Sequence, residues 1–125
     1  MNTEGPGTYH FPAMRRGDTF RARDIATLTQ DSVPLAITSA RMQVRAKNGG
    51  AVLLEWDTAA TVPTAEITGA DSNVVRLHAK AAAAMQLVPP GQHEYDLEVV
   101  FASDDAQLTI LAGKFPVTPD VTRTT

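Results

Sequence analysis

Strict alternation of apolar and polar residues is the feature that most constrains how this chain folds. It is clearest in residues 41–47, where Met42, Val44 and Ala46 share one side of an extended segment and polar residues occupy the other. Successive side chains of a β-strand point to opposite faces of the sheet, so a period of two indicates a strand with one buried face. The same period recurs along the chain, which is therefore expected to consist mainly of strands.

Turn signals divide the alternating segments into separate strands. Residues 48–50, Asn-Gly-Gly, supply the positive φ angles of a hairpin turn, and Pro63, Gly69 and Gly91 interrupt other runs. We expect strands over residues 19–28, 41–47, 52–57, 65–68, 74–79, 94–101 and 108–117. Seven short strands of this kind predict an all-β fold, a seven-stranded antiparallel β-sandwich of the immunoglobulin or fibronectin-III type.

Three local irregularities accompany this pattern. Residues 81–84 are all alanine, and their helix propensity predicts one short helical turn near residues 80–86. The inward side of the last strand changes near Gly113, which predicts a bulge there. The register of the first strand stays open, because Asp24 and Ile25 occupy the wrong sides for a simple alternation.

The inward positions define an expected core and one expected local motif. The core is predicted to contain Trp56, Leu77, Tyr95, Leu97, Val99 and Phe115. Tyr95 follows a Pro/Gly corner, which is typical of a tyrosine corner whose hydroxyl bonds to backbone in residues 87–91. The alternative is that Tyr95 is an ordinary core aromatic residue.

The chain is expected to form one domain with two appendages. Its 125 residues suit a single core. Residues 1–15, rich in glycine and proline, are predicted to be a flexible N-terminal arm, residues 16–119 the sandwich and residues 120–125 a C-terminal tail. Tyr9 and Phe11 on the arm have no obvious intramolecular position, so we expect them to dock on a neighbouring molecule.

Composition excludes several classes of function. The formal net charge of −3 argues against a nucleic-acid partner, and no apolar run approaches the length of a membrane span. The absence of cysteine excludes disulfides and thiolate metal sites. The first fourteen residues lack an apolar segment after a positive start, so we expect no signal peptide.

No pattern of catalytic residues stands out. His10, His78 and His93 lie far apart in sequence, and we expect the latter two to be solvated on outward positions. The chain has no nucleophile elbow and no phosphate-binding glycine loop. Residues 16–18, Arg-Gly-Asp, match the integrin-binding tripeptide by letter, but we interpret them as a turn. We therefore expect no enzymatic activity, no cofactor, no metal and no small-molecule substrate.

The charged residues suggest two faces of opposite sign. In the immunoglobulin order the first, second and fifth strands share one sheet, and the third, sixth and seventh share the other. The first group would present Arg21, Arg23, Arg41, Arg45, Lys47 and Arg76 outward. The second would present Glu55, Asp57, Glu94, Asp96 and Glu98. Such faces would favour ordered packing of molecules, the alternative being that both are simply solvated.

Four blocks of sequence resemble a known group of proteins. They are residues 16–20 (RGDTF), 39–45 (SARMQVR), 90–99 (PGQHEYDLEV) and 108–122, which contains LAGKFPV. Their order and spacing resemble those of small tail, neck or baseplate-associated structural proteins of tailed bacteriophages and prophages. Similar sequences occur at the start of longer baseplate proteins, where an immunoglobulin-like sandwich is expected. The resemblance implies a structural role in the virion, with assembly in the bacterial cytoplasm, and no catalytic residues.

Two functions follow from these observations. The first is a structural or assembly module of a phage or prophage particle that contacts other virion proteins or copies of itself. The second is an adhesin-like or carbohydrate-binding sandwich, for which the few aromatic residues and their mostly inward positions are unfavourable. Under the first, the candidate contact residues are Tyr9, Phe11, Arg41, Arg45, Lys47, Arg76, Glu94, Asp96 and Glu98.

Overall fold

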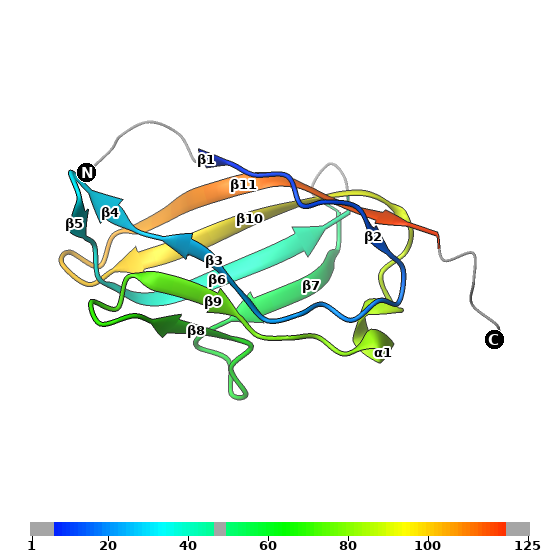
Figure 1. The fold of residues 1–125 in the computed structure, drawn as a ribbon, viewed down its shortest axis with the longest axis horizontal. Coiled ribbons are helices and arrows are strands. Elements are labelled where there is room, and N and C mark those ends of the chain that lie inside the picture. The colour runs from blue at the N-terminus through cyan, green and yellow to red at the C-terminus, as the bar shows by residue number, and fades with distance from the viewer. Residues whose placement is uncertain (1–6, 47–49, 120–125) are drawn as a thin grey trace.

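The computed structural model describes residues 7–46 and 50–119, and it is an all-β fold of two sheets packed against each other (Figure 1). The larger sheet has the strand order β1-β11-β10-β6-β7, with β2 also paired to β11. Its strands are β1 (Gly7–Thr8), β2 (Met14–Arg15), β6 (Ile37–Arg45), β7 (Val52–Asp57), β10 (Gly91–Phe101) and β11 (Gln107–Thr118). Lys47, residues 1–6 and the expected tail 120–125 lie outside the described residues.

The smaller sheet has three strands in the order β3-β9-β8. They are β3 (Arg23–Thr27), β9 (Val74–Leu77) and β8 (Ala65–Thr68). A separate hairpin of β4 (Thr29–Gln30) and β5 (Val33–Pro34) projects from one end of the molecule (Figure 1). The single helix of the described residues, α1 (Ala82–Met85), confirms the short helical turn expected from the alanine run.

The core lies between the sheets and follows the alternation of the sequence. All six residues predicted to be in the core are buried, and Trp56, Leu77, Leu97 and Phe115 have no exposed surface. Along β10 the buried and exposed positions alternate for most of the strand, as the period of two predicts. Burial of these apolar side chains is the main favourable contribution to folding.

The N-terminal segment is part of the sandwich, which differs from the expected free arm. β1 and β2 both run parallel to β11, one beside Leu111 and Ala112 and the other beside Val117 and Thr118. Between them Phe11 is only 3% exposed and belongs to the core. The chain therefore gains one edge strand, interrupted near Pro12, that the sequence pattern did not indicate.

This additional strand also changes the sheet to which the second expected strand belongs. The segment expected to be the second strand is β6, and it lies between β10 and β7 rather than beside β3 and β9. The prediction of one basic and one acidic sheet took residues 19–28 as the first strand, and it therefore grouped residues 41–47 with β3 and β9. It is wrong for this reason.

Bulges account for the irregular segments. β11 has an extra residue at Ile110, because Leu97 pairs with Leu111 and Glu98 with Thr109. The expected bulge thus exists, but three residues before Gly113. β3 has an extra residue at Ile25, which explains why its register could not be resolved by simple alternation.

The outer edge of the larger sheet at β7 is interrupted in a similar way. Leu53 is an extra residue opposite β6, so Val52 turns outward and is 42% exposed instead of joining Leu54 and Trp56 in the core. The Asp57 carbonyl accepts a hydrogen bond from the Thr64 backbone, and the Thr64 hydroxyl accepts one from the Asp57 backbone. These two bonds occupy the backbone groups of Asp57 at the end of this edge.

Among the residues that the structure describes, α1 is much too short to cross a lipid bilayer, and no longer apolar helix is present.

The burial of Leu97 yields a quantitative expectation. Leu97→Ala should lower the free energy of unfolding by about 2–5 kcal/mol, because it removes a fully buried side chain and leaves a cavity. Leu87→Ala is the matched control, since Leu87 is 79% exposed and its truncation should change stability by less than about 0.5 kcal/mol. Urea denaturation followed by Trp56 fluorescence measures both, and equal losses would contradict the core assignment.

Candidate functional site

A groove of about 450 Å³ lies on the outward side of the larger sheet, across β11, β10 and β6. It contains Arg45, Glu94 and Asp96, three of the residues that the sequence analysis named as candidates for contact. The rest of its lining comprises His10, Gln43, Tyr95, Ala112, Gly113 and Lys114. The groove thus brings together basic, acidic, amide and imidazole side chains.

Charges of opposite sign face each other across the strands of the groove. Glu94 pairs in register with Lys114 on one side and with Arg45 on the other. Asp96 lies between Gln43 and Ala112 in the neighbouring row. Opposite charges directly across a pair of strands attract weakly, by a few tenths to about 1 kcal/mol. The groove is therefore close to electrically balanced.

The His10 side chain, which lines the groove, accepts a hydrogen bond that a backbone carbonyl would accept in a regular pair of strands. The backbone N–H groups of Tyr9 and Phe11 donate to Ala112 and Lys114 of β11, at 3.0 and 2.9 Å. In a regular parallel ladder the Lys114 N–H would then donate to the Tyr9 carbonyl. It donates instead to Nδ1 of His10, at 3.1 Å, so that nitrogen carries no proton in this arrangement.

The Tyr9 carbonyl is free of the ladder because it turns toward the core. The Tyr95 hydroxyl donates to it at 2.6 Å. The prediction that the acceptor lies in residues 87–91 is wrong, because the Tyr95 side chain points beneath the N-terminal strand. His93 holds the Pro/Gly corner instead, because its Nε2–H donates to the Pro89 carbonyl at 2.7 Å.

Gly113 allows the backbone of Tyr9 to lie this close to β11. A Cβ atom at position 113 would overlap the Tyr9 carbonyl oxygen, and it would also come close to the Tyr9 carbonyl carbon and the His10 ring. Only a residue without a side chain allows the N-terminal strand to approach so closely. The sequence signal was an isolated glycine inside a strand, which indicates either a bulge or a close approach of another segment.

Phe11 secures the strand from the core side. Its ring centroid lies 4.9 Å from those of both Tyr95 and Phe115, and 6.4 Å from that of Phe20. Tyr9 packs on Phe11 edge to face, at 5.1 Å, and is 43% exposed. Of the two aromatic residues expected to dock on a neighbour, Phe11 is used within the chain, and Tyr9 is partly available.

Two further candidates, Arg41 and Glu98, pair with each other on the same outward face. Their side chains are 3.3 Å apart and both are partly exposed. Gln43 and Glu55 form a hydrogen bond of 2.6 Å nearby. Exposed pairs of this kind contribute at most about 1 kcal/mol, so their main effect is to balance charge on this face.

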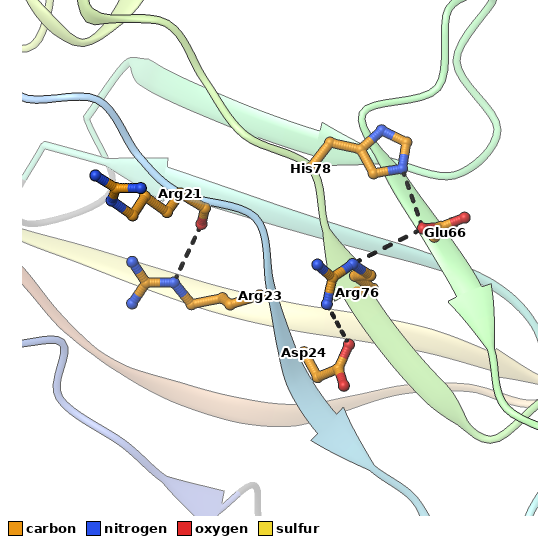
Figure 2. A network of polar contacts seen from close by, with 6 residues as sticks. All are labelled: Arg21, Arg23, Asp24, Glu66, Arg76 and His78. Atoms are coloured by element: carbon orange, nitrogen blue, oxygen red, sulfur yellow. Dashed lines mark hydrogen bonds and ion pairs between the residues drawn. The ribbon is translucent and has the colours of Figure 1, made fainter.

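The remaining candidate, Arg76, lies on the other sheet in a network of its own (Figure 2). It approaches Asp24 at 3.0 Å and Glu66 at 4.0 Å, and His78 approaches Glu66 at 3.6 Å. Figure 2 shows Arg23 on the neighbouring strand, directed to the carbonyl of Arg21. Acidic and basic residues are thus mixed on this face as well.

The histidines do not meet. His78 is partly exposed, as expected, whereas His93 is 6% exposed and buried, which corrects its expected outward position. It precedes Tyr95 and Leu97 by two and four residues, so it shares their inward side. Within residues 7–46 and 50–119, no three histidine or carboxylate groups are placed to hold a metal ion.

No family model and no curated protein sequence matches the chain. Among solved structures, CopC from Methylosinus trichosporium OB3b aligns with a TM-score of 0.43 and 13% sequence identity, and the match covers 72% of each chain.

Among the described residues, two side chains have a clearly shifted pKa. Burial, and to a lesser extent the nearby Tyr9, raises the pKa of Tyr95 to about 12. Burial lowers the pKa of Lys80, and Glu55 partly offsets this shift. The Lys80 ammonium lies 4.9 Å from the centroid of the Trp56 ring, a cation–π contact at the rim of the core. Both perturbations arise from side chains that support the fold.

Removal of the Tyr95 hydroxyl tests its role. Tyr95→Phe leaves the Tyr9 carbonyl without its donor and should lower the free energy of unfolding by about 1–3 kcal/mol. Because the folded state favours the neutral phenol, this stabilisation is present below about pH 10 and is lost as pH rises toward about 12. A tyrosinate absorbance step near pH 12 should be seen in the unmodified protein and be missing from the variant. An unchanged titration would contradict the assignment.

A side chain at position 113 should displace the N-terminal strand. Gly113→Ala is expected to cost about 1–3 kcal/mol and to raise hydrogen exchange at Tyr9 and Phe11, because Cβ and the Tyr9 carbonyl cannot occupy the same space. Ala112→Val, one residue away, is the control and should preserve protection of both amides. Equal exchange in the two variants would show that the close approach at Gly113 is not needed.

Proposed function

We propose that this chain is a non-catalytic structural module of a bacteriophage or prophage particle that acts through protein–protein contacts. The observation that carries the proposal is the use made of the polar groups in the groove. His10 and Tyr95 are both engaged in holding the N-terminal strand, and Glu94 lies between Lys114 and Arg45 in cross-strand register. The groove therefore has the character of a supported surface, and the sequence resemblance supplies the phage setting.

We infer further that the sandwich is of the immunoglobulin or fibronectin-III type. The neighbours β3, β9 and β8 correspond to strands B, E and D of that fold, and β11, β10, β6 and β7 correspond to G, F, C and C′. The N-terminal strand then lies beside the last strand. Sandwiches of this class present loops at both ends and sheet faces between them, all of which suit contacts with other proteins.

The alternative of a carbohydrate-binding module receives less support. Such a site needs exposed aromatic side chains, and among the described aromatic residues Tyr9 alone is substantially exposed. The others are buried in the core: Phe11, Phe20, Trp56, Tyr95, Phe101 and Phe115.

The proposal is tested by the composition of particles. Induced cultures of the bacterium that encodes the chain should yield density-purified particles in which mass spectrometry finds this protein in constant ratio to a major structural protein. A second preparation from a strain lacking the gene should give incomplete particles. Particles of normal composition and infectivity without the protein would contradict a structural role.

A further inference from the structure

The two ends of the sandwich carry charges of opposite sign. One end, here called the acidic end, is formed by the loops between β4 and β5, β8 and β9, and β10 and β11 (Figure 1). The loops comprise residues 31–32, 69–73 and 102–106, all of which the structure describes. They carry four exposed aspartates and no lysine or arginine. The aspartates are Asp31, Asp71, Asp104 and Asp105.

Hydrogen bonds connect two of these loops to the segments that flank the hairpin of β4 and β5. The backbone N–H of Leu28 donates to Asn73 at 2.8 Å, and the buried Asn73 amide donates back to Leu28 at 3.0 Å. The Ile37 N–H donates to Ser72, and the Ala102 N–H donates to Ala36. These bonds attach the loops that follow β8 and β10 to the segments on either side of the hairpin of β4 and β5.

The opposite end, here called the basic end, has a surplus of positive charge. It contains the end of β2, the end of β6 and the segment around α1 (Figure 1). Its cationic side chains are Arg15, Arg16, Arg45, Lys80 and Lys114, and its carboxylates are Asp18 and Glu94. Arg16 is fixed by a hydrogen bond of 2.9 Å from Nε to the Gln86 carbonyl, which ties β2 to the segment after α1.

Each end also exposes a large apolar side chain. Val33, beside the turn at Asp31, is 60% exposed at the acidic end. Leu87, two residues after α1, is 79% exposed at the basic end. Contacts between proteins combine an apolar centre with charged groups around it, and each end offers both elements.

The sheet faces offer less unpaired charge than the ends. On the larger sheet Arg41 pairs with Glu98, and on the smaller sheet Arg76 pairs with Asp24. Charges that are balanced within a molecule exert little attraction on a second one, whereas a surplus of one sign does. The electrostatic polarity of the described chain therefore runs along the strands.

We propose that copies of this chain associate end to end, with the acidic end of one molecule against the basic end of the next. Such a contact joins two different surfaces, so it repeats and produces a ring or a filament. The inference rests on the proposed assembly role, to which it adds the partner, a second copy, and the direction of contact. It replaces the sheet-to-sheet attraction expected from the sequence.

The first test measures the mass of the purified full chain in solution. Analytical ultracentrifugation at about 0.05 M salt should show species larger than the 13.4 kDa monomer that grow with protein concentration. They should dissociate at about 0.5 M salt, where the screening length falls from above 10 Å to a few Å. A monomer throughout, or association that does not respond to salt, would overturn the end-to-end contact. Either result is independent of the particle assay.

The second test reverses charge at one end at a time. Asp71→Lys at the acidic end and Arg15→Glu at the basic end should each weaken self-association by about tenfold or more. Mixed together, the two variants should form a one-to-one dimer, because one retains a basic end and the other an acidic end.

The matched control places the same added charge elsewhere. Ala59→Lys combined with Thr61→Lys changes the net charge as much as Asp71→Lys does, but in the exposed loop between β7 and β8, away from both ends (Figure 1). This variant should associate as the unmodified chain does. If it loses association equally, or if the mixture of the two reversed variants stays monomeric, the proposal is wrong.

Discussion

A connected series of aromatic side chains joins the N-terminal strand to the centre of the core. Tyr9 packs on Phe11, Phe11 contacts Tyr95, Phe115 and Phe20, and Phe20 lies 4.8 Å from Trp56 between ring centroids. Each buried aromatic ring contributes a large apolar area, and pairs of this geometry add about 0.5–1.5 kcal/mol. Both the core and the groove depend on this series, because Phe11 fixes the strand that carries His10.

The alternation in the sequence was sufficient for the class of fold and for most of the core. β10 is predictable because buried and exposed residues alternate over most of its length. It is also a central strand, paired with β11 on one edge and with β6 on the other, so one of its faces must be buried. The bulge at Ile110 was predicted near Gly113. The sequence locates the point where the apolar residues of a strand change from one face to the other only to within a few residues. The bulges at Ile25 and Leu53 interrupt the alternation and so hide the register.

The candidate site was harder to predict because it depends on pairing between distant segments. Phe11 lies between His10 and Pro12 in a short segment broken by proline, so no sustained period marks it as buried. The acceptor role of His10 and the path of the Tyr9 carbonyl follow from tertiary contact with β11. Once this N-terminal strand is missed, β6 is taken for the second strand of the fold instead of the third, and Arg41 and Arg45 are assigned to the wrong sheet.

The pairing of β1 and β2 with β11 has a consequence for how the protein is made. Hydrogen bonds between these segments join residues 104 positions apart. During translation the N-terminal strand therefore emerges long before its partner, and Phe11 stays in contact with water or with other proteins until β11 has left the ribosome. Contacts so distant in sequence slow folding, since a long loop must close first. A nascent chain that stalls before β11 would expose both this aromatic residue and the unpaired edge of β10.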